Sequence, residues 1–174
     1  KETSVFIPIA ERMPRIPDNH FPYIFIVYDK DKKTRAMLPS LIAKASETNA
    51  TLFVILVFTD ADDKLLTALL TKAPSVRVIV YGEMFGNIRL PRSPFGFLLS
   101  QATSGQVIVF GTGLQKVYPV HTRDVLSGIL ACAFADQGKE RLFYLLPKHP
   151  PTELSVVRLL RKIHPLLKLD FGKR

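Results

Sequence analysis

Three short runs of apolar residues recur through the first half of the chain, and they restrict its fold more than any other feature. The runs lie at residues 23–28, 51–58 and 76–81, and each is rich in β-branched and aromatic side chains. Such runs are typical of strands buried on both faces of a sheet. Apolar residues at helical spacing fill the intervals 34–47 and 62–72. The alternation predicts a β-α-β-α-β unit with a parallel sheet, which is half of a doubly wound α/β fold.

The first helical interval contains a proline at position 39. Proline is best tolerated in the first turn of a helix, because it has no N–H to donate to the preceding turn. We therefore expect this helix to begin near Leu38.

The second half of the chain is less regular, and its elements are shorter. We predict a loop at 83–94, and the inner face of the last helix should carry Leu154, Val157, Leu160 and Ile163. The remaining predictions are a helix at 95–103, a strand at 106–110, a helix at 124–135 with Asp124 in its first turn, a buried strand at 141–146, a helix capped by Thr152 that ends at His164, and a loose tail at 169–174.

Composition narrows the setting and the partners. The 174 residues are 47% hydrophobic, which suffices for one compact α/β domain. Cys132 is the single cysteine, so an internal disulfide and a multi-cysteine metal site are excluded, and a reducing, cytoplasmic compartment is expected. No apolar run is long enough to span a membrane. The net charge of +9 favours anionic partners, namely nucleotides, nucleic acid or anionic lipid.

Residues 105–125 carry the most specific pattern in the chain. An apolar run is followed by a Gly111-Thr-Gly113-Leu-Gln115 turn, and Asp124 then opens an apolar helix. Preceded by the strand at 76–81, an aromatic-glycine pair and an arginine-rich loop, this order resembles the extended short-chain dehydrogenase/reductases, the NAD-dependent epimerase/dehydratase family. The resemblance covers residues 76–164.

The resemblance implies a fold, a cofactor and a ligand. The fold is a Rossmann-like parallel sheet flanked by helices, forming a single domain over 1–174 with a small substrate-type subdomain at 83–125. The implied cofactor is NAD or NADP, with no metal, and the implied ligand is a nucleotide or a nucleotide sugar.

Two motifs of that family are missing, and both belong to its chemistry. The chain has no glycine before Gly82 and therefore no glycine-rich turn after a first strand, where the backbone would approach the pyrophosphate of a dinucleotide. It also lacks the catalytic Tyr-x-x-x-Lys, and Asp60 and Lys64 stand at that spacing instead. A carboxylate ionised at neutral pH cannot protonate a carbonyl as a phenol does. The alternative interpretation is an acidic first turn of a helix.

The candidate anion-binding residues follow from the same resemblance. Aligned on the family, the chain places its substrate-side residues at Phe85, Gly86, Arg89, Arg92 and Lys116. The cations among them fall on loops where doubly wound folds bind ligands, and solvated loop charges are the alternative. At three further positions the chain departs from the family, with Glu83 where asparagine is usual, Val80 where arginine is usual and Val117 where an arginine contacts the diphosphate.

Three functional hypotheses remain open. The first is a divergent epimerase/dehydratase-like protein that binds a nucleotide-like anion and is catalytically degenerate; if active, it would perform NAD(P)-linked redox at a sugar carbon. The second is an interaction or scaffold protein that kept the fold, with the helix at 62–72 buried in a homodimer or against a protein partner. The third, less favoured, is a basic nucleic-acid-binding module. His121 is either a general base or a packed histidine.

Overall fold

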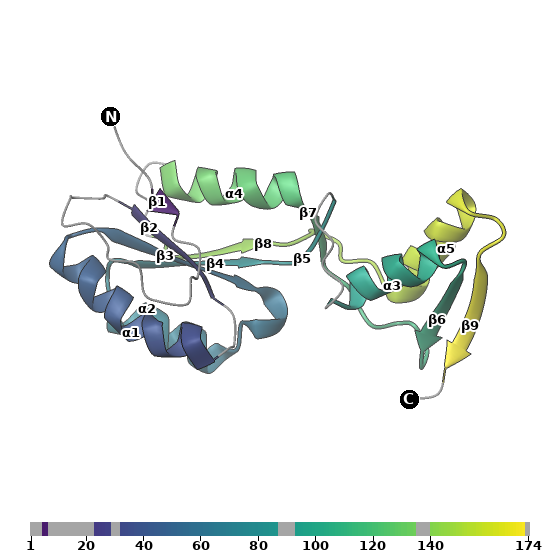
Figure 1. Ribbon diagram of the computed structural model, residues 1–174, viewed down its shortest axis with the longest axis horizontal. Coiled ribbons are helices and arrows are strands. Elements are labelled where there is room, and N and C mark those ends of the chain that lie inside the picture. The colour runs from purple at the N-terminus through teal and green to yellow at the C-terminus, as the bar shows by residue number, and fades with distance from the viewer. Residues whose placement is uncertain (1–4, 7–22, 29–31, 87–92, 135–139, 173–174) are drawn as a thin grey trace. The chain divides into compact units, whose positions relative to one another are not determined.

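The computed structural model describes residues 5–6, 23–28, 32–86, 93–134 and 140–172 (Figure 1). The chain divides into two compact units. The first comprises Lys1–Tyr81 with Leu126–Leu145, and the second comprises Gly82–Val125 with Leu146–Arg174. The second unit thus contains the stretch 83–125 together with the C-terminal segment.

The first unit is built on a five-stranded sheet in the order β1-β2-β3-β4-β8, with all neighbouring pairs parallel. Helices α1 and α2 cover one face of this sheet, and the part of α4 that belongs to this unit covers the other (Figure 1). The predicted α/β class, a Rossmann-like parallel sheet flanked by helices, is confirmed. The elements of this unit are β1 (Val5–Phe6), β2 (Tyr23–Tyr28), α1 (Lys32–Glu47), β3 (Thr51–Val57), the 3-10 turn η1 (Phe58–Asp60), α2 (Asp63–Lys72), β4 (Val76–Tyr81), α4 (Thr122–Phe134) and β8 (Leu142–Leu145).

The main core of this unit lies between the sheet and the helices α1 and α2. Alternate residues of the central strand, Leu52, Val54 and Leu56, are fully buried there. Leu38 and Leu41 of α1 pack against them. Burying a leucine side chain stabilises the folded state by about 1.5–3 kcal/mol. The strands in this layer therefore carry apolar side chains, and the apolar runs in the sequence predict them.

The other face of the sheet is aromatic. The rings of Phe25 and Phe53 are stacked with their centroids 4.9 Å apart, and Tyr23 meets the ring of Phe134 from α4 edge-on at 5.7 Å. Cys132 of α4 is buried on this side, and its carbonyl accepts a long hydrogen bond from Arg77. The thiol therefore sits within the fold rather than on its surface.

Helix α1 begins at Lys32, so the predicted start near Leu38 was wrong, and Pro39 lies inside the helix. Pro39 has no N–H to donate to the carbonyl of Arg35, four residues earlier. Pro39 is exposed, so water can solvate that carbonyl. The burial of Thr34 and Leu38 on the sheet side holds the first two turns in place and outweighs the lost hydrogen bond.

Strand β8 is shorter and less buried than the fully buried strand expected at 141–146. Arg141 precedes the strand and does not belong to it. Its guanidinium donates hydrogen bonds to the carbonyls of Leu70 at 2.6 Å and Ala73 at 3.0 Å, at the C-terminal end of α2. A cation at a helix C-terminus satisfies carbonyls that have no partner within the helix.

The second unit holds two short parallel strand pairs and two helices. The predicted loop at 83–94 was wrong in its first part, because 83–85 form a strand, and the predicted loose tail was wrong because 168–172 pair with β6. Neither strand has a long apolar run to reveal it. The elements are β5 (Glu83–Phe85), α3 (Pro94–Thr103), β6 (Gln106–Phe110), β7 (Pro119–His121), α5 (Glu153–Ile163) and β9 (Lys168–Gly172).

Helix α5 packs on the core of this unit through Val156, Val157 and Leu160. Thr152 caps it as predicted, since its hydroxyl oxygen accepts a hydrogen bond from the N–H of Ser155. Ile163, in the last turn of the helix, was placed on the inner face, but 64% of it is exposed.

Candidate functional site

The residues that resemble the substrate side of a dehydrogenase gather around the pair β5–β7 in the second unit. Glu83 lies opposite Pro119 and Phe85 lies opposite His121 in this parallel pair. Gly82, just before β5, is buried, and a Cβ there would overlap the carbonyl oxygen of Tyr118. Only glycine lets the two segments approach this closely.

Glu83 is the one buried acidic side chain among the described residues, and only 4% of it is exposed. Its carboxylate accepts two backbone hydrogen bonds, from Phe95 at 2.6 Å and from Tyr118 at 3.2 Å. Phe95 is in the first turn of α3, where the helix dipole favours a negative charge. The carboxylate thus ties β5, the N-terminus of α3 and the segment before β7 together.

Phe85 and Gly86, two predicted ligand residues, lie beside His121. The Phe85 ring meets the imidazole edge-on at 5.3 Å, and it meets Phe95 at 5.4 Å. Gly86 has a φ of +125°, and a Cβ there would lie 3.1 Å from Nε2 of His121. The carbonyl of Phe85 accepts a hydrogen bond from the Thr122 hydroxyl at 2.8 Å.

His121 is partly buried in this cluster. The N–H of Arg123 donates a hydrogen bond to Nδ1 at 3.2 Å. Accepting at Nδ1 assigns the ring proton of the neutral form to Nε2. Nε2 is therefore a donor beside Gly86, a position suited to a ligand oxygen. From the sequence, His121 was predicted to be either a general base or a packed histidine.

The cations of the predicted site are less well placed. Lys116 is exposed, and the adjacent Val117 is buried in the core of the second unit. Val117, and not Lys116, therefore occupies the position that aligns with the family's arginine. Lys116 also bridges Thr152 across an isolated antiparallel pair. Arg89 and Arg92 lie outside the described residues.

The Gly-x-Gly turn that suggested the family has a structural task in this chain. Gly111 and Gly113 both have φ near +68°. The carbonyl of Gly113 accepts a hydrogen bond from the N–H of Leu154 at 2.9 Å, and a Cβ there would lie 2.6 Å from Val109. The turn therefore joins β6 to the beginning of α5.

The weak catalytic candidates lie in the first unit. Asp60 ends the turn η1, and Lys64 is exposed in the first turn of α2. The carboxylate that caps this helix is Asp62, which accepts a hydrogen bond from the N–H of Leu65 at 2.8 Å. The segment thus begins a helix with an acidic cap and first turn, and it places no phenol where the family's chemistry needs one.

No group of three or more histidine, cysteine or carboxylate side chains among the described residues is arranged to hold a metal ion. Among the helices that the structure describes, none combines the length and the apolar character that crossing a bilayer requires.

Comparison with known proteins identifies the fold. No protein-family model and no curated protein sequence matches the chain. Solved structures do match, and three of them cover 88% of this chain: a UDP-glucuronic acid 4-epimerase from Bacillus cereus in complex with NAD (13% identity, TM-score 0.67, 63% of that chain), an L-threonine dehydrogenase from Phytophthora infestans (14%, 0.67, 65%) and an NAD-dependent NDP-hexosamine 5,6-dehydratase involved in tunicamycin biosynthesis (12%, 0.64, 64%).

These matches establish that the chain has an extended short-chain dehydrogenase/reductase-like fold. At 12–14% identity they establish the fold alone. The chain spans less than two thirds of the length of each of these structures. A sugar-nucleotide epimerase and a threonine dehydrogenase match equally well, so the fold does not choose the substrate.

Proposed function

We propose that this chain is a divergent relative of the NAD-dependent epimerases and dehydratases that binds a nucleotide-sugar-like anion and does not carry out their redox chemistry. The binding residues in this proposal are Phe85 and Gly86, with Lys116, Arg89 and Arg92 as the cations. His121 joins them, because its Nε2 lies beside Gly86 and can donate a hydrogen bond to a ligand oxygen.

The pairing of β1 with β2 supports the proposed absence of redox chemistry. In the doubly wound order 3-2-1-4-5-6, strands 1 and 4 are neighbours in the sheet, but two strands and their helices separate them in the chain. In this chain the parallel neighbours β1 and β2 take the places of strands 1 and 4, and only residues 7–22 separate them. That segment contains no glycine, so it lacks the residues with which the family's first turn holds a pyrophosphate.

Nucleotide-sugar binding is supported more loosely. The fold neighbours include the Bacillus cereus epimerase in complex with UDP-glucuronic acid and NAD, and a second protein, MoeE5, in complex with NAD and either UDP-glucuronic acid or UDP-glucose. The chain's charge of +9 favours an anionic ligand. Within residues 1–174, NAD or NADP would have to be held without a glycine-rich turn.

Calorimetric titration with UDP-glucuronic acid tests the binding site. We expect saturable binding that weakens by about tenfold in Arg89→Ala and in Arg92→Ala, because each removes a charge-assisted hydrogen bond to a phosphate. Lys33→Ala, which removes an exposed cation from α1, is the matched control and should bind normally. Absence of heat at millimolar ligand, or equal losses in all three variants, would exclude the proposed site.

A second candidate function, a docking or scaffold role, is favoured by the outer face of α4. Leu126, Leu130 and Phe134 recur at four-residue spacing and are about half exposed, and no charge interrupts them. The leucines of the helix at 62–72 pack on the sheet, so a dimer through this helix would use its other face. Light scattering that gives a monomer at high concentration, in both the parent and Leu130→Glu, would count against the self-associating form.

A further inference from the structure

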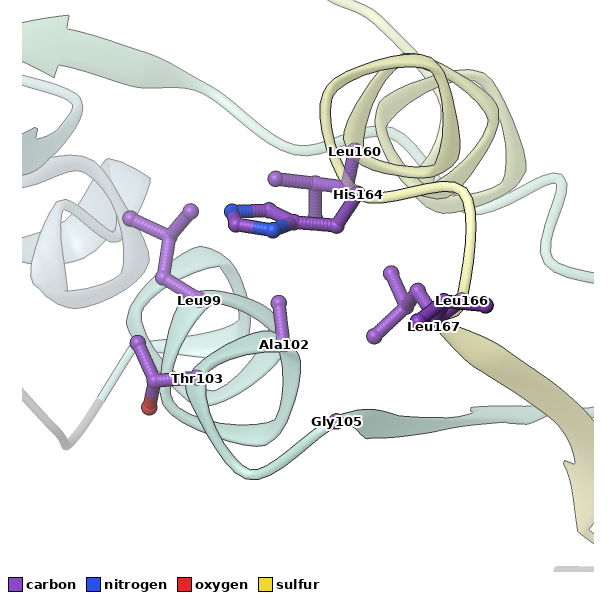
Figure 2. Close-up of a pocket in the computed structure, with 8 residues that line it drawn as sticks. All are labelled: Leu99, Ala102, Thr103, Gly105, Leu160, His164, Leu166 and Leu167. Atoms are coloured by element: carbon purple, nitrogen blue, oxygen red, sulfur yellow. The ribbon is translucent and has the colours of Figure 1, made fainter.

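A hollow of about 610 Å³ lies in the second unit, and none of its lining residues belongs to β5 or β7 (Figure 2). Its size falls within the range of about 300–1,000 Å³ that is usual for small-molecule sites. Side chains from α3 stand opposite the end of α5 and the turn that leads to β9. The lining residues are Leu99, Ala102, Thr103, Gly105, Leu160, His164, Leu166 and Leu167.

The walls of this hollow are almost wholly apolar. The hydroxyl of Thr103 already donates a hydrogen bond to the carbonyl of Ser100 at 2.7 Å. The imidazole of His164 points between Leu160 and Leu99 in Figure 2 and makes no hydrogen bond with any of the described residues. One polar group on an apolar wall is the arrangement that orients a ligand with a single polar end.

The surroundings of the hollow are basic. Arg161 and Lys168 are exposed and adjoin the lining residues Leu160 and Leu167 in the sequence, and the exposed Lys162 lies two residues from His164. Helix α3 carries no acidic residue, and the acidic residue of α5, Glu153, is at its opposite end. Leu166, on the rim, is 93% exposed, which is costly for a leucine with nothing to cover it. The basic charge and the apolar surface together favour an anionic amphiphile as the ligand. A second copy of this chain is disfavoured because it is itself basic.

We propose that this hollow binds an acyl chain with an anionic head group, with the tail against the leucines and the head at His164. The site is separate from the nucleotide site proposed above, and its test uses no nucleotide. Failure of one proposal therefore leaves the other standing.

The first test is calorimetric titration with hexanoate, octanoate and decanoate, each below its micelle-forming concentration. Affinity should rise by about fourfold for each methylene that enters the hollow and should level off when the hollow is full. Octanol, which has no charge, should bind about tenfold more weakly than octanoate. Equal affinity for octanol and octanoate, or no detectable binding of any of the acids, would overturn the proposal.

Variants locate the binding. Ala102→Phe fills the hollow and should abolish octanoate binding, whereas Ala131→Phe, the same change at an exposed position of α4, should not. Leu166→Ser removes an exposed rim residue that does not support the fold and should weaken binding by about tenfold, with Leu126→Ser as its control. Losses that are the same in the test and control variants would place the ligand elsewhere.

Two further measurements distinguish a free fatty acid from a membrane lipid as the source of the acyl chain. His164→Gln should weaken octanoate binding by about tenfold and leave octanol binding unchanged, because only the acid has a head group for the imidazole. Sedimentation with vesicles of phosphatidylglycerol should be prevented by decanoate if the same hollow takes a lipid tail. Binding to these vesicles without binding to monomeric decanoate would contradict the hollow and indicate a membrane-contacting face.

Discussion

The carboxylate of Glu83 accepts a hydrogen bond from the N–H of Phe95 at 2.6 Å, so a strand residue supplies the negative charge at the beginning of helix α3. Both residues are buried. In the family that the sequence resembles, an asparagine is expected at this place. In this chain the negative charge is built into the protein, which narrows where a ligand phosphate can sit.

Replacing Glu83 tests that arrangement. Glu83→Ala should lower the free energy of unfolding by about 2–4 kcal/mol, because it leaves two buried backbone N–H groups without an acceptor. Glu83→Gln keeps the shape and should cost less, about 1–2 kcal/mol. Urea unfolding followed by circular dichroism measures both. A cost below about 0.5 kcal/mol for the alanine variant would show that the carboxylate is not needed there.

Gly82 should be less replaceable than a glycine in an open turn. Gly82→Ala brings a Cβ onto the Tyr118 carbonyl and should cost more than about 2 kcal/mol, because backbone must move. Gly111→Ala meets open space and should cost only about 1 kcal/mol, the penalty of its positive φ. The same unfolding measurement compares them, and equal costs would mean that β5 and the segment before β7 are not in close contact.

Pro39 offers a stabilising substitution. Pro39→Ala restores a helical hydrogen bond in the middle of α1 and should raise the free energy of unfolding by about 1–3 kcal/mol. The gain is reduced by the greater freedom of the unfolded chain without proline. Ser40→Ala, at the next exposed position of the helix, is the control. A destabilised Pro39→Ala protein would show that the helix does not continue through this residue.

Cys132 links stability to alkaline pH. Burial raises the pKa of its thiol above the ordinary value of 9.0, and the nearby Arg77 guanidinium opposes this only in part. The folded protein therefore holds the thiol proton to higher pH than the unfolded chain does. The resulting stability is complete below pH 9.0 and is lost as the pH rises toward the pKa of the folded state.

Unfolding measured from pH 8 to 10 checks that expectation. The parent protein should lose stability relative to Cys132→Ala as the pH passes about 9. The native thiol should also react more slowly with iodoacetamide than the thiol of the unfolded chain. Parallel stability curves for the two proteins would show that Cys132 is not buried as described.

The C-terminal strand should matter to the second unit. Removing residues 168–174 deletes β9, the partner of β6 along its whole length. We expect the shortened protein to expose the second unit to protease while the sheet of the first unit stays resistant. Unchanged protease resistance of both units would contradict the pairing of β6 and β9.

The parallel sheet could be predicted from the sequence because its strands carry their own signal. The runs at 23–28 and 76–81 match β2 and β4 residue for residue, since strands that are mostly buried carry mostly apolar side chains. Strands β5 and β9 carry no such signal. Each is short and only partly buried, and its partner lies far away in the sequence.

The candidate site was predictable only in part, for a related reason. Phe85 and Gly86 could be found from an aromatic-glycine pair that the family shares. The contact of Gly86 with His121 depends on the β5–β7 pairing, which local pattern cannot reveal. The apolar hollow is likewise formed by residues from separate helices, none of which is unusual alone.

We propose that this dehydrogenase-like sheet does not hold a dinucleotide and that the chain binds a nucleotide-sugar-like anion. Parallel calorimetric titrations with NADH and with UDP-glucuronic acid, at one pH and one salt concentration, test it most directly. We predict saturable binding of the nucleotide sugar and no measurable binding of NADH at the same concentrations. Tighter binding of NADH than of the nucleotide sugar would contradict the account.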